Sequence, residues 1–294
     1  MDLEILTSYS FLVVCVGTMI LAATAGTVGT LTVLKGQSLI GDAIGHASYP
    51  GVVIAFMVGL VMDPVILIIG AALSGLFAYF FIQFISKNSK VNLDAILATI
   101  LSMFFGLGMV LKSYIQGHPE YLSTPQGGLQ NYIFGQAAFI RRIDVLLILC
   151  IAIPTIIIFL LFYKEFKLFI FDELYAKSIG LNTNIMYTIM LFIILGVIVV
   201  GLKFVGAILI SSFLIVPAIA ALQWSERFNQ VLLIASLIGI LSAFLGSYLS
   251  SVYPGMSTGP SIILMMSGLA FLSMFFGPKG FIATKIRRRS LLKK

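Results

Sequence analysis

Residues 36–61 read GQSLIGDAIGHASYPGVVIAFMVGLV, a stretch of helix length that becomes strongly apolar only in its second half. The first half carries Asp42 and His46, which stand four residues apart and would share one face of a helix. At about 1.5 Å per residue from Lys35, both side chains would lie roughly 10–17 Å into a hydrocarbon core about 30 Å thick. The stretch therefore indicates a membrane-spanning helix with two ionisable groups at depth.

The composition of the whole chain agrees with a membrane protein. Of its 294 residues, 60% are hydrophobic and 10% are charged, whereas a soluble domain has about 25% charged residues. The mean hydropathy of +1.11 leaves nothing for a water-facing shell. The N-terminus is acidic and lacks the basic region of a cleaved signal peptide, so the first apolar run is expected to remain as a span. Cys15 and Cys150 fall in apolar runs and carry no redox or zinc signature.

Apolar runs of about 18 residues predict transmembrane helices, and the chain carries about nine, or eight if the short sixth and seventh are counted differently. They lie near residues 11–34, 38–61, 65–85, 93–111, 145–163, 185–201, 205–222, 231–250 and 260–276. No strand pattern or soluble domain is visible, so the expected fold is an all-α polytopic membrane protein. We expect one transmembrane domain over residues 1–284 and a basic cytoplasmic tail over residues 285–294.

The distribution of Lys and Arg predicts the orientation. With the N-terminus outside and nine alternating spans, fourteen of these residues lie on the cytoplasmic side and four lie outside. Cytoplasmic loops of membrane proteins carry the excess of positive charge, so the C-terminus is expected inside. The net charge of +7 is concentrated in short loops and the tail, which argues against nucleic-acid binding. The polar stretch over residues 112–144 is expected to lie along the outer surface and to dip partly into the protein.

The Asp42 and His46 side chains carry the chemistry of the chain. Ionisable groups at membrane depth are costly and usually functional. A hard carboxylate oxygen beside a borderline imidazole nitrogen suits Mn(II), Zn(II) or Fe(II). Two other interpretations are a buried pair that only fixes helix packing and a proton relay. Four further residues of the stretch are expected to shape the helix, by thinning it or by kinking it at a proline: Gly41, Gly45, Gly51 and Pro50.

The residues 36–51 also resemble the signature of the manganese/zinc/iron-type metal ABC permeases. Three further segments match that family in the expected order: FDELYAKSIGL at residues 171–181, VGAILISSFLIVPAIAA at residues 205–221 and STGPSIIL at residues 257–264. The second of these is a helix of small residues that ends near Pro217, which is expected to shape it. Together the matches cover nearly the whole chain.

The resemblance implies a fold related to the type II importer permeases, in a bacterial cytoplasmic membrane. It implies a homodimer that works with two cytoplasmic ATPase subunits and takes its ion from a lipid-anchored or periplasmic metal-binding protein. It implies that Asp42 and His46 handle the metal in transit, with no cofactor bound permanently. Overall likeness to the Gram-positive members favours manganese, with zinc and iron as alternatives.

A mixed segment over residues 164–183 predicts a short amphipathic helix between the membrane and a soluble partner. The alternative is an interfacial helix with no partner, but the resemblance favours a coupling helix that docks on the ATPase. The residues expected to form this contact are Phe171, Asp172, Glu173, Ala176, Ile179, Gly180 and Leu181. Residues 224–227 follow the seventh span on the same side and are expected to join it.

The chain contains no Gly-x-x-x-x-Gly-Lys-Ser/Thr loop, so it is not expected to be an ATPase itself. Its energy must come from a partner or from an ion gradient. The rival interpretation is a secondary transporter that moves metal with protons, but such proteins carry more intramembrane carboxylates and two related halves. An intramembrane metalloenzyme would need about three protein ligands, and one chain offers a single His in a span.

Overall fold

The computed structural model describes residues 6–122, 127–253 and 255–285, which are largely helical. The helices are α2 (Tyr9–Leu34), α3 (Ile40–Gly59), α4 (Pro64–Asn88), α5 (Leu93–Gly117), α6 (Pro119–Leu122), α7 (Asn131–Phe134), α8 (Arg142–Leu161), α9 (Tyr163–Phe171), α10 (Glu173–Ser178), α11 (Thr183–Leu222), α12 (Phe228–Val252) and α13 (Thr258–Phe276), with short 3₁₀ turns η1 (Gly127–Gln130) and η2 (Ala137–Phe139). Of the predicted basic tail over residues 285–294, only Lys285 lies within the described residues. The expected all-α fold is confirmed.

Within the described ranges, seven helical segments are long and apolar enough to cross a membrane. Helix α3 adds a further 20-residue helix that is less apolar because it contains Asp42, His46 and Pro50. Helix α11 covers 40 residues but consists of two helices joined at Gly206, where the backbone is not helical. It therefore counts as two spans, and the helices described agree with the prediction of about nine. The chain is a multi-pass membrane protein.

Helix α11 is divided at Gly206, where φ is 79° and ψ is 168°. The sequence predicted two spans here, and the structure joins them through this one residue instead of a loop. Gly206 lies against Gly135, and a Cβ atom on either residue would overlap the backbone beside the other. The backbone N–H of Gln136 donates to the carbonyl of Phe204 at 3.2 Å. The segment around Gly135 and Gln136 therefore packs into the break.

An ion pair fastens the start of α8 to the same break. Lys203 Nζ lies 3.0 Å from Asp144 Oδ1, and both side chains are nearly buried. The other oxygen of Asp144 accepts from the backbone N–H of Arg141 at 3.0 Å. The guanidinium of Arg141 also reaches this oxygen at 3.4 Å, but it is largely exposed.

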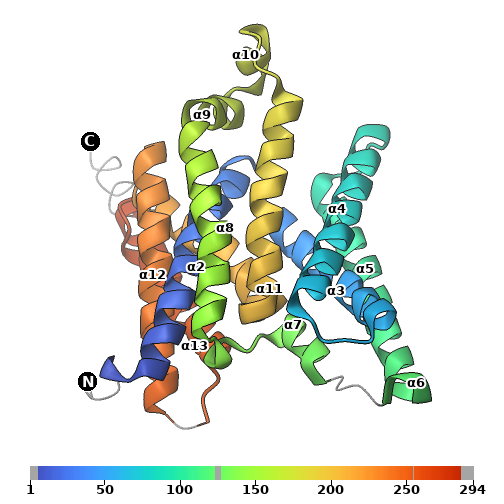
Figure 1. Ribbon diagram of the computed structural model, residues 1–294. Helices are drawn as coiled ribbons and strands as arrows, with labels where there is room; N and C mark the ends of the chain where they lie inside the picture. The colour runs from blue at the N-terminus through green and yellow to red at the C-terminus, as the bar shows by residue number, and fades with distance from the viewer. Residues whose placement is uncertain (1–5, 123–126, 254, 286–294) are drawn as a thin grey trace, which may run out of the picture.

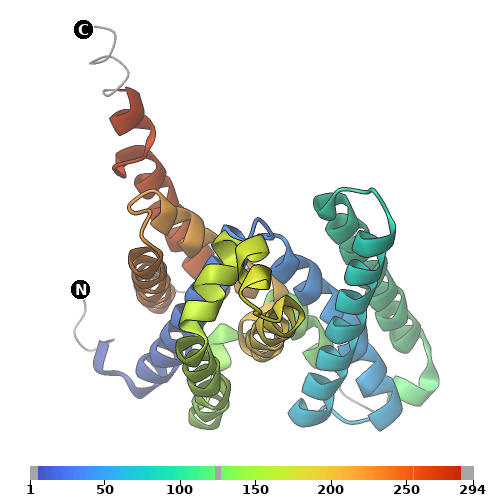
Figure 2. The same ribbon diagram turned by 90° about the horizontal axis from the view of Figure 1, so that it is seen from above.

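The connections gather at two ends of the bundle, as Figure 1 shows. The start of α2, α6 and α7 lie at one end, while α9, α10 and the connection between α2 and α3 lie at the other. Seen from above in Figure 2, α12 and α13 lie on one side and α3, α4 and α5 on the other, with α2, α8 and α11 between them. Most residues of α2, α3 and α11 are buried, whereas only about a third or fewer of the residues in the apolar stretches of α4, α5, α8 and α13 are buried. Apolar surface of this kind is what a lipid bilayer solvates.

Candidate metal path and coupling site

Helix α3 starts immediately after a tight connection from α2. The connection turns at Gly36, where φ is 73°. The backbone N–H of Gln37 donates to the carbonyl of Thr32 at 2.8 Å, and that of Ile40 donates to Gln37 at 3.1 Å. Asp42 thus stands in the first turn of α3, where the partial positive charge of the helix N-terminus favours a carboxylate.

The residues predicted to shape α3 differ in what they do. A Cβ on Gly51 would overlap the carbonyl of Gly70, so this glycine lets α3 and α4 meet backbone to backbone. Gly41 faces only the flexible side chain of Leu214, and at Gly45 the nearest atom to an added Cβ is 3.8 Å away. Pro50 lies inside the helix and cannot donate the helical hydrogen bond to the carbonyl of His46. Only Gly51 is therefore sterically required as a glycine.

Asp42 and His46 meet on one face of α3, as their spacing predicts. His46 Nε2 lies 3.5 Å from Asp42 Oδ1, and the side chains are 17% and 31% exposed respectively. Phe105 of α5 packs against the imidazole with ring centroids 5.1 Å apart and planes at 83°. The other ring nitrogen, Nδ1, is buried and has no hydrogen-bond partner among the described residues.

This pair offers one oxygen and one nitrogen to a divalent ion. No cluster of three or more His, Cys, Asp or Glu side chains that could hold a metal occurs in the part of the chain that the structure describes. A single chain thus leaves coordination positions open. An open, partly exposed pair suits an ion that must be released more than it suits a closed structural site.

The predicted coupling segment forms two helices, and not the single helix that the amphipathic pattern suggested. The break is at Asp172, where φ is −147° and ψ is 83°. The Asp172 carboxylate accepts from the backbone N–H of Tyr175 at 2.9 Å and so caps α10. Asp is a preferred N-cap residue because it satisfies an N–H at the start of a helix.

The end of α10 explains two more of the predicted residues. Gly180 has a φ of 88°, a left-handed conformation that favours glycine. The N–H of Leu181 donates to Ala176 at 3.0 Å and that of Gly180 donates to Lys177 at 3.1 Å. These two bonds form a Schellman motif, which closes the helix. Ala176 is fully buried beneath it.

Large apolar side chains around α10 point to solvent. Phe171 and Ile179 are both more than half exposed. Leu174 and Tyr175, which are not among the residues predicted for this contact, are 79% and 55% exposed. Both residues lie in the same motif, FDELYAKSIGL at residues 171–181, so the sequence could have identified them. Figure 1 shows α10 projecting beyond the end of the bundle, so this apolar surface is open to a partner.

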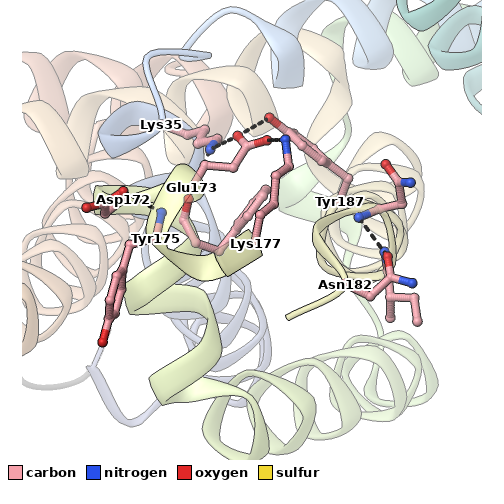
Figure 3. A network of polar contacts seen from close by, with 10 residues as sticks. Lys35, Asp172, Glu173, Tyr175, Lys177, Asn182 and Tyr187 are labelled. Atoms are coloured by element: carbon pink, nitrogen blue, oxygen red, sulfur yellow. Dashed lines mark hydrogen bonds and ion pairs between the residues drawn. The ribbon is translucent and has the colours of Figure 1, made fainter. Parts of the chain in front are cut away.

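A polar network holds α10 to the rest of the chain, as Figure 3 shows. Lys35 Nζ and the Tyr187 hydroxyl both donate to Glu173 Oε2, at 2.7 and 3.0 Å. Lys177 lies 2.9 Å from Glu173 Oε1. Partial burial by itself would raise the pKa of Glu173, but the hydrogen bonds from Lys35, Lys177 and Tyr187 outweigh it and lower the pKa to about 2. The carboxylate is therefore ionised at physiological pH.

The predicted second contact over residues 224–227 lies at the same end of the bundle. Trp224 is about half exposed, and Glu226 pairs with Lys279 at 2.6 Å. This hydrogen bond lowers the pKa of Glu226. Phe171 meets Phe228 edge-on, with ring centroids 6.0 Å apart. The structure thus brings the end of α9 beside the start of α12.

Comparison with known proteins places the chain in a family. The ABC 3 transport family matches residues 8–277. The manganese transport system membrane protein MntC of Bacillus subtilis is 38% identical over 96% of this chain, which spans 64% of that protein. The zinc transport system membrane protein TroC of Treponema pallidum is 36% identical over 98% of this chain and 95% of its own length.

A solved structure agrees with these sequence matches. The structure of PsaBC from Streptococcus pneumoniae in complex with Fab contains a chain that is 26% identical, with a TM-score of 0.83. The alignment covers 97% of this chain and 100% of that one. With a fold, a motif order and a family match that all span nearly the whole sequence, this chain belongs to the ABC 3 transport family.

Proposed function

We propose that this chain forms the membrane path of an ATP-driven importer and moves a divalent transition metal, with Mn²⁺ favoured over Zn²⁺ and Fe²⁺. The chain is the membrane permease of such an importer and is not its ATPase. The observation that carries the path is the Asp42–His46 pair, which is partly exposed on α3 and lies 3.5 Å apart. Manganese is favoured because several of the relatives are manganese transport proteins, although an Asp–His pair also accepts Zn²⁺ and Fe²⁺.

The number of ligands supports a homodimer. One chain offers two side chains, so two copies that face each other would offer two carboxylates and two imidazoles. Water would complete the coordination, since a closed cage of protein ligands would hold the ion too tightly for release. An empty site would keep Asp42 and His46 together, and a passing ion would replace their mutual contact.

The α9–α10 end supports docking of two cytoplasmic ATPase subunits, one on each copy. Phe171, Leu174 and Ile179 are exposed there, and exposed apolar patches mark sites of interaction with proteins or membranes. Among the described residues, most Lys and Arg lie at this end, which is why we place it in the cytoplasm of a bacterial cell. A metal-binding lipoprotein would deliver the ion at the opposite end, where the chain begins.

Uptake of Mn²⁺ into proteoliposomes that contain the whole complex tests this proposal. Asp42→Asn keeps the size and one oxygen but loses the negative charge, so we expect uptake to fall to background. Asp94→Asn is the matched control, because Asp94 also stands in the first turn of a membrane helix but is exposed. Both variants should assemble and bind the ATPase. Full transport by the Asp42→Ala, His46→Ala double variant would place the metal path elsewhere.

The alternative is a secondary transporter that couples metal to protons. It predicts that the chain alone accumulates metal in vesicles under a proton gradient. The proposed function predicts no accumulation there until the ATPase and ATP are added.

A further inference from the structure

Lys35 stands where the end of α2 meets α9 and α10. It caps the C-terminal end of α2, but its side chain leaves that helix and is only 10% exposed. Its ammonium group donates to the carbonyl of Phe169 at 3.0 Å and to Glu173 at 2.7 Å. It also lies 4.0 Å from the centroid of the Phe169 ring, within the range of a cation–π contact. A single side chain from the transport bundle thus contacts both α9 and α10.

The far side of Lys35 is connected to the metal pair through a short, hydrogen-bonded segment. Only residues 36–39 separate Lys35 from α3. The N–H groups of Gly36 and Gln37 bond back to the last turn of α2, and Ile40 bonds to Gln37. Because these bonds leave little slack, a shift of Lys35 must move the first turn of α3, which carries Asp42.

Away from the Lys35 contact, a cavity separates α10 from α3. A polar cavity of about 400 Å³ lies between α10, α11, α4 and the start of α3, and Gln37, Gln83, Glu173 and Tyr187 are among its lining residues. The cavity removes direct packing across this gap. The Lys35–Glu173 ion pair is therefore a direct polar link from α10 to the connection that starts α3.

We propose that Lys35 is a positioning residue of the transport cycle, whose ion pair with Glu173 passes movements of α10 to α3 and so to the Asp42–His46 pair. This inference rests on the proposed function, because it assumes that an ATPase moves α10. In this proposal, Lys35 itself does not contact the ion.

The ion pair is a poor candidate for a purely stabilising role. Burying two charges costs desolvation, and apolar side chains of similar size often stabilise a protein as well. The charge of Glu173 is already balanced by Lys177 at 2.9 Å. What Lys35 adds is a connection between different parts of the chain, whereas Lys177 pairs with Glu173 within α10 itself.

The difference between these two lysines gives the experiment its control. Lys35→Met and Lys177→Met each remove one ammonium group from Glu173 and keep a long side chain. The assay is the complete complex in proteoliposomes, with ATP hydrolysis and uptake of radioactive Mn²⁺ measured on the same sample. The readout is the number of ATP molecules hydrolysed per ion, which a loss of folded protein alone does not change.

We expect Lys35→Met to keep ATP hydrolysis while Mn²⁺ uptake falls about tenfold, which corresponds to about 1.4 kcal/mol. The ratio of ATP to Mn²⁺ should rise accordingly. It should stay at the wild-type value in Lys177→Met and be largely restored in Lys35→Arg, which keeps the charge and the donors. If Lys35→Met gives no assembled complex, the ratio in Glu173→Gln decides, and it should rise as well.

Two outcomes overturn the inference. One is a wild-type ratio in both Lys35→Met and Glu173→Gln, and the other is an equal rise in Lys35→Met and Lys177→Met. A wild-type complex that shows no ATP-dependent uptake of Mn²⁺, Zn²⁺ or Fe²⁺ is a different result, because it contradicts the proposed function itself. The wild-type measurement thus separates the two failures.

Discussion

Replacing Lys203 by Met should destabilise the chain, because it leaves the carboxylate of Asp144 buried without its main counter-charge. Lys203 Nζ and Asp144 Oδ1 are 3.0 Å apart and both side chains are almost inaccessible to solvent. Removing one partner of a buried ion pair typically costs about 3–5 kcal/mol. Arg141 still reaches the other carboxylate oxygen through its backbone N–H at 3.0 Å, so we expect the lower value, about 3 kcal/mol.

The melting temperature of the protein purified in detergent measures this loss. A large domain loses roughly 2 °C per kcal/mol, which gives a fall of about 6 °C. A thiol-reactive dye can follow unfolding through Cys15, which is buried, in a Cys150→Ser background that removes the exposed thiol. The Arg141→Met variant is the control. Its side chain is 73% exposed, and exposed pairs contribute less than about 1 kcal/mol.

A double variant tests the physical cause. Lys203→Met with Asp144→Asn removes the stranded charge but keeps an oxygen that accepts the Arg141 N–H. Most of the lost stability should therefore return, since the cost lies in the unpaired charge and not in missing contacts. If Lys203→Met melts with the wild type, or if the double variant melts no higher than Lys203→Met, then the unpaired charge of Asp144 is not what destabilises the chain.

Two further predictions follow from the helix break and from the exposed face of α10. Gly206→Ala should lower the melting temperature, because φ is 79° there and a Cβ would overlap the Gly135 backbone. The control is Gly106→Ala, which lies in open space on α5 and should melt no lower than the wild type. Leu174→Asp should weaken co-purification of the ATPase, because Leu174 is 79% exposed on α10, while Tyr253→Asp at the opposite end should not. Equal ATPase recovery from both of these variants would remove α10 from the docking surface.

The spans could be predicted because hydropathy is a local property of the sequence. The interruption of the apolar run around Lys203 and Gly206 was visible as a boundary between two spans. Its form was not, because a left-handed glycine in place of a loop depends on the fit of Gly135 against it. That contact joins residues that are far apart in the chain, and no local pattern encodes it.

The candidate site could likewise be predicted from the sequence only in part. The Asp42–His46 contact follows from the four-residue spacing alone. The break at Asp172 had a local signal, since Asp is a strong N-cap residue, but the amphipathic pattern continued across it and favoured one helix. From the sequence, Lys35 is a positive charge in a short loop before a predicted span. Its partners Phe169 and Glu173 are more than 130 residues away, so its role needed the tertiary structure.

The proline in α3 gives that helix a point of low bending stiffness beside the metal pair. Since Pro50 has no N–H, the turn between His46 and Pro50 has one backbone hydrogen bond fewer to break or stretch. Beyond it, the contact of Gly51 with Gly70 clamps α3 to α4. Before it, the first turns of α3 are attached to the connection that begins at Lys35. A force on the first turns of α3 would therefore bend the helix more easily at this turn than at a turn with all its hydrogen bonds, next to the half that carries Asp42 and His46.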